Sequence, residues 1–289
     1  MQITEHIHAL KIDFTLPMAP GVTLNRFAYV YVIFGKRIYL VDTGVKTGVP
    51  AIFDYIEQAG RRPEEIAAVI LTHCHPDHIG GARIIRDACG CEICIHESDA
   101  SWTEDTGKQF ESRPVPGFDQ LVAGDVPVDR VLRDGDRLVF EDAVDLNVLH
   151  TPGHSAGSVA LRYPGDTALF TGDTLLVPGE MPIYEDILEL AESVRRLSRL
   201  KGVGTLFSSW ESPVSGKESI KDRIGRSLEH LRRIHETVCR IADGRSLDPM
   251  DLCRQYIAES GLPPFAANPL VAKGLASSRD RCHIDLLVE

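Results

Sequence analysis

Short apolar runs between turn residues fill the first 216 positions and predict a series of β-strands. Residues 1–20 alternate weakly between apolar and polar side chains, which predicts one or two opening strands. The apolar run at 66–71 is short and continuous, as in a buried strand. Two pairs of runs, at 27–41 and 158–170, are each interrupted by a short turn and predict β-hairpins. The remaining predicted strands lie at 92–96, 138–140, 144–149 and, as the last strand, 203–207.

Apolar residues three and four positions apart predict helices. These helices lie at 50–60, 82–88 and 186–200, and an apolar stripe with the same spacing runs on from about residue 217. Asp248-Pro249 and Asn268-Pro269 each have the order of an N-cap followed by the first helical residue. The C-terminal part of the chain is therefore expected to be helical.

These patterns predict two parts: a mixed α/β domain over residues 1–216 and a C-terminal helical extension over residues 217–289, packed on it. Residues 97–130 are polar and contain several prolines and glycines. We expect them to form a long surface insertion, and such insertions often shape a pocket.

The densest candidate chemistry follows the strand predicted at 66–71. Residues 72–81 read THCHPDHIGG and place three histidines and an aspartate within six positions. Pro76 and the two glycines cannot continue a strand, so we expect a loop at the strand end with side chains turned inward. Imidazole nitrogen and carboxylate oxygen are ligands of zinc, iron and manganese. Since His154 and Asp173 follow two further predicted strands, the segment predicts a metal site and not a surface turn.

The composition argues against several classes of binding partner. The 289 residues carry a formal net charge of −11, which argues against nucleic acid or an anionic membrane as the main partner and leaves a small-molecule substrate. No apolar window is long enough for a membrane span, and the N-terminus lacks the pattern of a signal peptide. Seven scattered cysteines fit reduced thiols better than a disulfide framework, so we expect a cytoplasmic protein.

Four motifs together resemble the metallo-β-lactamase superfamily, in its glyoxalase II-like (hydroxyacylglutathione hydrolase-like) branch. They are LVDTG at 40–44, the segment at 72–81, TPGHSAG at 151–157 and FTGDT at 170–174, and the resemblance covers residues 20–213. It implies a four-layer αββα sandwich with a metal site at one edge between the two sheets. Carried over by position, the first metal would be held by His73, His75 and His154, and the second by Asp77 and His78, with Asp173 bridging the two.

The sequence departs from the family pattern at one ligand. The family has a further histidine after the last strand, and Trp210 stands at that position. Indole has no lone pair free for a metal. Glu211 is one residue away and is a possible replacement, and a distant histidine (His230, His235 or His283) is another. We therefore expect one firmly held divalent ion and a weak, absent or water-completed second site. Zinc is the first expectation for the metal, with iron or manganese as alternatives.

Several other residues are candidates for a role at the site. Asp42 is expected to support the metal loops by hydrogen bonds and not to ligate. Tyr184 and Trp210 are candidates to line the pocket. Cys91 and Cys94 flank a strand with no second cysteine pair, so a metal role is not expected. His230 and His235 are expected on the solvated face of their helix.

The resemblance implies a metal-dependent hydrolase, in which a metal-bound hydroxide cleaves an ester, thioester or lactone carbonyl with Asp77 and Asp173 as catalytic carboxylates. One alternative is an oxidoreductase resembling the mononuclear-iron persulfide dioxygenases, because two histidines and a carboxylate suit non-haem iron. Another is a weakly active or non-catalytic metal-binding module, because Trp210 replaces a ligand. We also predict a homodimer through the C-terminal helices.

Overall fold

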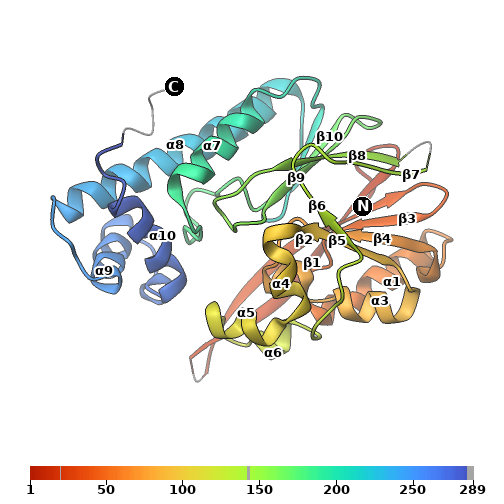
Figure 1. The fold of residues 1–289 in the computed structure, drawn as a ribbon, viewed down its shortest axis with the longest axis horizontal. Helices are drawn as coiled ribbons and strands as arrows, with labels where there is room; N and C mark the ends of the chain where they lie inside the picture. Colours follow the sequence, from red (N-terminus) through yellow and green to blue (C-terminus); the bar gives the residue numbers. More distant parts are fainter. Residues whose placement is uncertain (20, 142–143, 285–289) are drawn as a thin grey trace. The chain divides into compact units, whose positions relative to one another are not determined.

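The computed structural model describes residues 1–19, 21–141 and 144–284 (Figure 1). Two six-stranded sheets organise it. The first sheet has the order β1 (Ile7–Ala19), β2 (Val22–Phe34), β3 (Ile38–Val41), β4 (Ile66–Ile70), β5 (Glu92–His96), β6 (Arg130–Leu132). The second has the order β12 (Val214–Ser215), β11 (Thr205–Ser208), β10 (Ala168–Gly172), β9 (Val159–Tyr163), β8 (Val144–His150), β7 (Arg137–Glu141).

Both sheets are mixed. In the first, β1, β2 and β3 pair antiparallel, whereas β3 to β6 run parallel. In the second, β10 and β11 are parallel and the other pairs antiparallel. Both predicted hairpins are confirmed, as β2–β3 and β9–β10. The opening segment forms one long strand, β1, because its partner β2 is equally long. The strand at 203–207 is not the last, since β12 follows it, and β6 was missed because it has only three residues.

Side chains from the facing sides of the two sheets form one apolar cluster. Tyr31, Tyr39 and Ile70 come from the first sheet, and Phe170 and Phe207 from the second. The ring of Tyr31 lies 5.3 Å from that of Phe170 and 5.1 Å from that of Phe207. Alternate residues of the first sheet, such as Val30 and Val69, belong to a second cluster with the helices on its other face. This alternation is what a strand buried on both faces requires.

Short helices and turns join the strands of the first sheet. The insertion expected at 97–130 contains three short helices, α4 (Glu97–Glu104), α5 (Thr106–Ser112) and α6 (Phe118–Leu121). The other elements are η1 (Lys46–Gly48), α1 (Val49–Gln58), η2 (Pro63–Glu65), α2 (Pro76–Ile79) and α3 (Ala82–Cys89). The helices predicted at 50–60 and 82–88 are therefore confirmed as α1 and α3.

Residue contacts divide the chain into two compact units. Unit 1 comprises residues 1–150, 157–172 and 202–215, and holds both sheets. Unit 2 comprises residues 151–156, 173–201 and 216–289, and its helices are α7 (Ile187–Ser198), α8 (Lys217–Ala242), α9 (Pro249–Ser260), η3 (Pro264–Ala266) and α10 (Pro269–Arg279). One of the boundaries between the two units falls between residues 215 and 216. The two-domain boundary proposed from the sequence stays a prediction.

The helical part of unit 2 follows the sequence pattern. Asp186, Asp248 and Asn268 each accept hydrogen bonds from two backbone N–H groups at a helix start, which confirms the two predicted cap pairs. The apolar stripe of α8 is buried, and α7, α9 and α10 of the same unit pack against this helix. The stripe therefore offers no support for the predicted homodimer.

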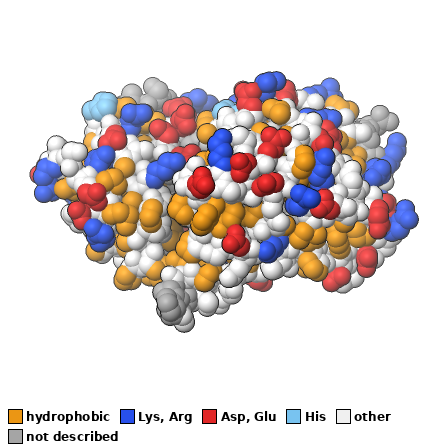
Figure 2. All heavy atoms as spheres, turned by 60° about the horizontal axis from the view of Figure 1, so that its bottom comes forward, with side chains coloured by type: hydrophobic (Ala, Val, Ile, Leu, Met, Phe, Trp, Pro, Cys, Tyr) orange, Lys and Arg blue, Asp and Glu red, His pale blue; other side chains and the backbone are white. Residues whose placement is uncertain are grey.

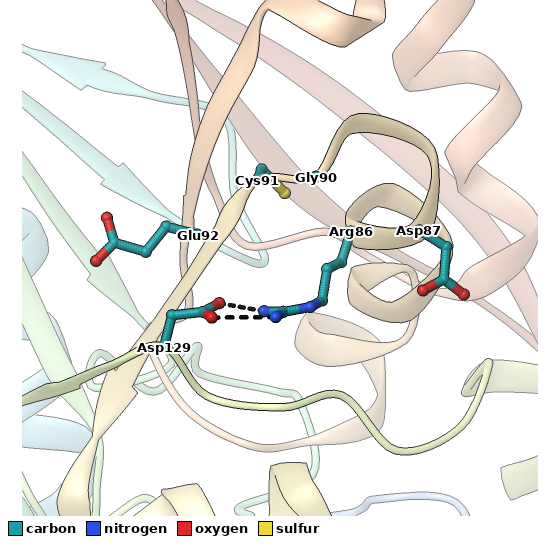
Figure 3. Close-up of a pocket in the computed structure, with 6 residues that line it drawn as sticks. All are labelled: Arg86, Asp87, Gly90, Cys91, Glu92 and Asp129. Atoms are coloured by element: carbon teal, nitrogen blue, oxygen red, sulfur yellow. Dashed lines mark hydrogen bonds and ion pairs between the residues drawn. The ribbon is translucent and has the colours of Figure 1, made fainter.

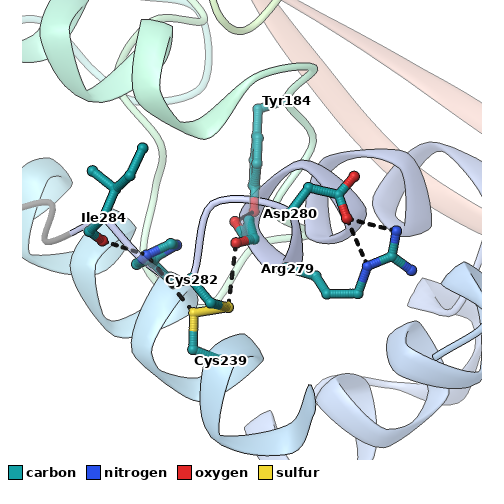
Figure 4. The surroundings of a disulfide bond; sticks show 8 residues. Tyr184, Cys239, Arg279, Asp280, Cys282 and Ile284 are labelled. Atoms are coloured by element: carbon teal, nitrogen blue, oxygen red, sulfur yellow. Dashed lines mark hydrogen bonds and ion pairs between the residues drawn. A yellow bond between two sulfur atoms is a disulfide. The ribbon is translucent and has the colours of Figure 1, made fainter. Parts of the chain in front are cut away.

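Two expectations about unit 2 are wrong. His235 is 5% exposed and its Nε2 lies 3.1 Å from the carbonyl of Ile284, so it is not on a solvated face, since residues after α10 cover it. Cys239 and Cys282 form a disulfide, with Cα atoms 5.3 Å apart (Figure 4), although all thiols were expected to be reduced. Their 43-residue separation hides the pairing in the sequence. Among the described residues, no helix is long and apolar enough to cross a membrane.

Candidate metal centre

Unit 1 supplies the histidine-rich loop. Strand β4 ends at Ile70, His75 has an extended backbone, and Pro76 then begins the single turn of α2, which carries His78. The sequence predicts a loop here. The structure has one helical turn within it, because proline favours the first position of a helix. The side chains of His73, His75 and His78 are 0–3% exposed. One ligand nitrogen of His73 lies within 4.8 Å of one from His75 and one from His78.

The spacing of His73 and His75 fits two ligands of one ion. Nε2 of His73 lies 3.0 Å from Nδ1 of His75. Two nitrogens bound to one tetrahedral zinc lie about 3.3 Å apart, given Zn–N distances of about 2.0–2.1 Å. The hydroxyl of Thr72 donates to Asp42 and so accepts from Nδ1–H of His73 at 3.0 Å. That hydrogen bond places the proton of His73 on Nδ1 and leaves its Nε2 lone pair available to a metal.

Asp42 supports this loop from the end of β3. It adopts φ +61° and accepts the backbone N–H of Thr72 at 2.7 Å and its hydroxyl at 2.9 Å. It also accepts Nδ1–H of His78 at 2.8 Å, which leaves the Nε2 lone pair of that imidazole available to a metal. The carboxylate of Asp77 lies 3.6 Å from this Nε2, with its side chain 17% exposed. Through these hydrogen bonds Asp42 would support the histidine loop, which is the role expected from the sequence.

Asp99, on α4, also holds the loop and was missed by the sequence reading. Its buried carboxylate accepts the N–H of Cys74 at 2.9 Å and that of Gly157 at 2.8 Å. A Cβ at Gly157 would stand 2.4 Å from the Asp99 carboxyl carbon, so only glycine fits there. Gln109 donates to the carbonyl of Cys74. Neither residue carries a sequence signal, because both lie in the insertion that no motif covers.

Unit 2 supplies the other two predicted ligands. Nε2 of His154 lies 3.4 Å from Oδ2 of Asp173, again close to the separation of about 3.3 Å expected for two ligands of one tetrahedral ion. Both side chains are nearly buried. Nδ1–H of His154 donates to the carbonyl of Ile183 at 2.9 Å, which leaves the Nε2 lone pair available to a metal.

The resemblance assigns the position of the missing ligand to Trp210. Trp210 lies in the turn between β11 and β12, partly exposed. Its ring is 4.3 Å from the Arg26 guanidinium and 6.2 Å from the ring of Phe27. In the described part of the chain, no set of three donors within 4.8 Å of one another includes Glu211 or the distant histidines His230, His235 and His283. The structure therefore identifies no replacement for the missing ligand.

Three further candidate residues are buried among other side chains. Tyr184 is 1% exposed and its hydroxyl lies 2.7 Å from that of Ser278, so its side chain faces α10. This position gives no support to the expectation that Tyr184 lines a pocket. Cys91 and Cys94 are buried around β5, and desolvation raises the pKa of Cys91 to about 12. A thiol that stays protonated is a poor metal ligand.

A separate pocket opens beside the end of α3. It is lined by Arg86, Asp87, Gly90, Cys91, Glu92 and Asp129, and the Arg86 guanidinium makes a two-pronged ion pair with Asp129 across it (Figure 3). None of these residues belongs to the predicted metal site.

The chain belongs to the metallo-β-lactamase superfamily, whose sequence profile matches residues 23–207. A hydroxyacylglutathione hydrolase of Rhizobium johnstonii is 27% identical over 84% of this chain and 86% of its own length. A hydroxyacylglutathione hydrolase of Hyphomonas neptunium is 29% identical over 68% of this chain and 70% of its own. These matches support the glyoxalase II-like branch and an enzyme of the metallo-hydrolase class.

Solved structures agree on the fold. A metallo-β-lactamase family protein from Thermus thermophilus superposes with a TM-score of 0.73 at 20% identity, covering 95% of this chain and 94% of that chain. A β-lactamase domain protein from Burkholderia ambifaria gives 0.70 at 18% identity, covering 94% and 86%. The predicted fold class, a metallo-β-lactamase α/β fold with C-terminal helices, is confirmed. Family and donor set together support binding of a divalent metal.

Proposed function

We propose that this protein is a metal-dependent hydrolase that cleaves the carbonyl of a thioester, ester or lactone. His73, His75 and His154 would hold the first ion, Asp77 and His78 the second, and Asp173 would bridge them. The observation that carries the proposal is the spacing of the donors. His73 and His75 in unit 1, and His154 and Asp173 in unit 2, each place two ligand atoms 3.0–3.4 Å apart.

A divalent ion bound there would acidify a water and act as a Lewis acid towards the substrate carbonyl. Thr72, Asp42 and the carbonyl of Ile183 keep three imidazoles in the tautomer with a proton on Nδ1. Asp77 is the more exposed of the two predicted catalytic carboxylates, at 17% against 7% for Asp173. It is therefore the group through which we expect a proton to pass to solvent.

The metal content remains part of the proposal. Since the resemblance assigns the missing ligand's position to Trp210, and no donor set among the described residues includes a replacement, we propose one firmly held ion, with zinc first and iron or manganese as alternatives. The second position would be completed by water or left empty.

For the substrate we propose a thioester first, because the relatives' names specify hydroxyacylglutathione. A mononuclear-iron persulfide dioxygenase is the alternative if the single metal is iron. A weakly active or non-catalytic module is the alternative if removing the metal alters stability without removing any activity.

The first experiment measures metal content by plasma mass spectrometry on protein purified without added metal or chelator. It is combined with hydrolysis assays on a hydroxyacylglutathione, a simple ester and a lactone. We expect about one equivalent of zinc and faster thioester cleavage, lost in His73→Ala but kept in His283→Ala, a change at an exposed histidine of the C-terminus. Iron with O₂ consumption would favour the dioxygenase. Protein that takes up no metal would overturn the proposal.

Three further points remain proposals: a cytoplasmic location, a homodimer, and the absence of nucleic-acid and membrane partners. The net charge of −11 supports the last of these. In the view of Figure 2, acidic and basic side chains are interspersed over the surface.

A further inference from the structure

His154 takes its orientation from a segment 29 residues further along the chain. Its Nδ1–H donates to the carbonyl of Ile183 at 2.9 Å. The following backbone is tied to the same loop, because the N–H groups of Glu185 and Asp186 donate to the carbonyl of Gly153 at 2.7 and 3.1 Å. The imidazole of His154 and the segment around Tyr184 thus form one hydrogen-bonded assembly within unit 2.

Helix α10 fixes that segment from the other side. The hydroxyl of Tyr184 lies 2.7 Å from that of Ser278, and the Nζ of Lys273 lies 2.7 Å from the carboxylate of Glu185. The backbones are also close. A Cβ built on Gly274 would lie 2.7 Å from the carbonyl oxygen of Tyr184 and 3.2 Å from its ring. Glycine at this helix position therefore sets how closely α10 approaches the segment that orients His154.

The far end of α10 is itself fastened. Cys282 lies three residues after the last residue of the helix and is bonded to Cys239 of α8 (Figure 4). Figure 4 also shows Tyr184 beside the C-terminal end of α10. The fold thus connects the covalent link, α10, Tyr184 and Ile183 to the His154 imidazole.

We infer that α10 is a positioning element for the metal centre: the Gly274–Tyr184 contact sets where the Ile183 carbonyl holds His154, and so sets metal affinity. The inference rests on the proposed function, in which His154 is a ligand. Groups that orient ligating histidines are typically worth about 10–100-fold in metal affinity or activity. Gly274, Tyr184 and Ile183 are not among the predicted metal ligands, so their role would be to position His154.

The test compares two glycine-to-alanine changes in helices of unit 2. Gly274→Ala introduces a methyl group that must displace Tyr184, whereas Gly225→Ala in α8 meets no atom within 4 Å. Zinc affinity is measured by competition with a chromogenic chelator, and the visible spectrum is recorded on the cobalt-substituted protein. We expect Gly274→Ala to bind zinc at least tenfold more weakly with an altered cobalt spectrum, and Gly225→Ala to match the wild type in both.

Tyr184→Phe is a second variant, which keeps the ring and removes only the hydroxyl that is hydrogen-bonded to Ser278. We expect an intermediate loss of affinity, and this variant decides the question if Gly274→Ala does not fold. A folded Gly274→Ala protein, or failing that a folded Tyr184→Phe protein, with wild-type affinity and cobalt spectrum would overturn the inference. The proposed function would stand in that case, because the wild type still binds the metal. A wild type that binds no metal would overturn both.

Discussion

At the scale of single residues, Asp42 is a buried carboxylate that accepts several hydrogen bonds beside the predicted ligands. It is 2% exposed and accepts three hydrogen bonds, two from Thr72 and one from His78. Its φ of +61° is tolerated by aspartate and asparagine better than by most residues. The backbone conformation and the acceptor role together explain an acidic residue at the end of β3.

Asp42→Asn is the sharpest change at this position, because asparagine keeps the backbone conformation and the side-chain shape. It removes the charge and replaces one acceptor oxygen with a donor group. We predict a loss of metal affinity of roughly 10–100-fold, as is typical when a partner of ligating histidines is altered. Chelator competition measures it.

The matched control is Asp13→Asn, a change at a β1 side chain that is 73% exposed and pairs with Lys11. We expect it to bind metal as the wild type does. Equal affinity in Asp42→Asn would show that the hydrogen bonds to Asp42 do not orient the ligands.

At the scale of elements, ion pairs join helices to the strand ends beside them. Arg86 of α3 pairs with Asp129, which precedes β6 (Figure 3). Asp129 also accepts the N–H of Ile93 in β5 at 2.9 Å. The hydrogen bond from Arg86 lowers the pKa of Asp129 below its usual value, and the same bond raises the pKa of Arg86. One carboxylate thus connects three neighbouring elements of unit 1.

This pair predicts a pH dependence of stability. Because the pKa of Asp129 is lower in the folded than in the unfolded protein, the pair stabilises the fold above the unfolded pKa of about 3.9 and is lost as pH falls through the folded value. We expect Asp129→Asn to lower the free energy of unfolding at pH 7 by about 1 kcal/mol, since the pair is partly exposed. The difference from wild type should shrink towards pH ~3.

Urea unfolding at pH 7 and at pH ~3 measures this difference. Asp87→Asn is the control, since Asp87 is on the same helix, pairs with Arg83 and is 58% exposed. A destabilisation by Asp129→Asn that is the same at both pH values would contradict the assignment to the ionised carboxylate.

At the scale of the whole molecule, the predicted ligands are divided between the two compact units. His73, His75, Asp77 and His78 belong to unit 1, and His154 and Asp173 to unit 2. Unit 2 draws together residues from three separate stretches of the chain and contains the disulfide between α8 and the residue stretch after α10. Its integrity should therefore depend on oxidation state.

The disulfide predicts a thiol count and a change in stability. In guanidinium without reductant we expect five reactive thiols per chain, and seven after reduction. Cross-linking across 43 residues stabilises by about 4 kcal/mol in the chain-entropy account, so reduction should lower Tm by several degrees. Thiol titration and calorimetry measure the two effects.

Cys282→Ser should reproduce the lower Tm and make it insensitive to reductant, whereas Cys253→Ser, at a buried free thiol of α9, should keep the sensitivity. Seven reactive thiols before reduction would contradict the disulfide.

The sequence alone was sufficient wherever the signal is local. The hairpins, the strand at 66–71, the capped helices at Asp248 and Asn268, and the family motifs depend on residues close together in the chain, because pleat, turn and cap geometry span only a few positions. Trp210 at the place of a ligand was visible for the same reason.

Only the tertiary structure could decide what depends on long-range contact. Asp99 supports the histidine loop from an insertion without a motif, and Cys239 finds Cys282 across 43 residues. His235 is buried because residues after α10 cover it, and Ile183 orients His154 from 29 residues away. Periodicity records which face of an element is apolar. It does not record which distant segment covers that face, because that follows from how the elements pack.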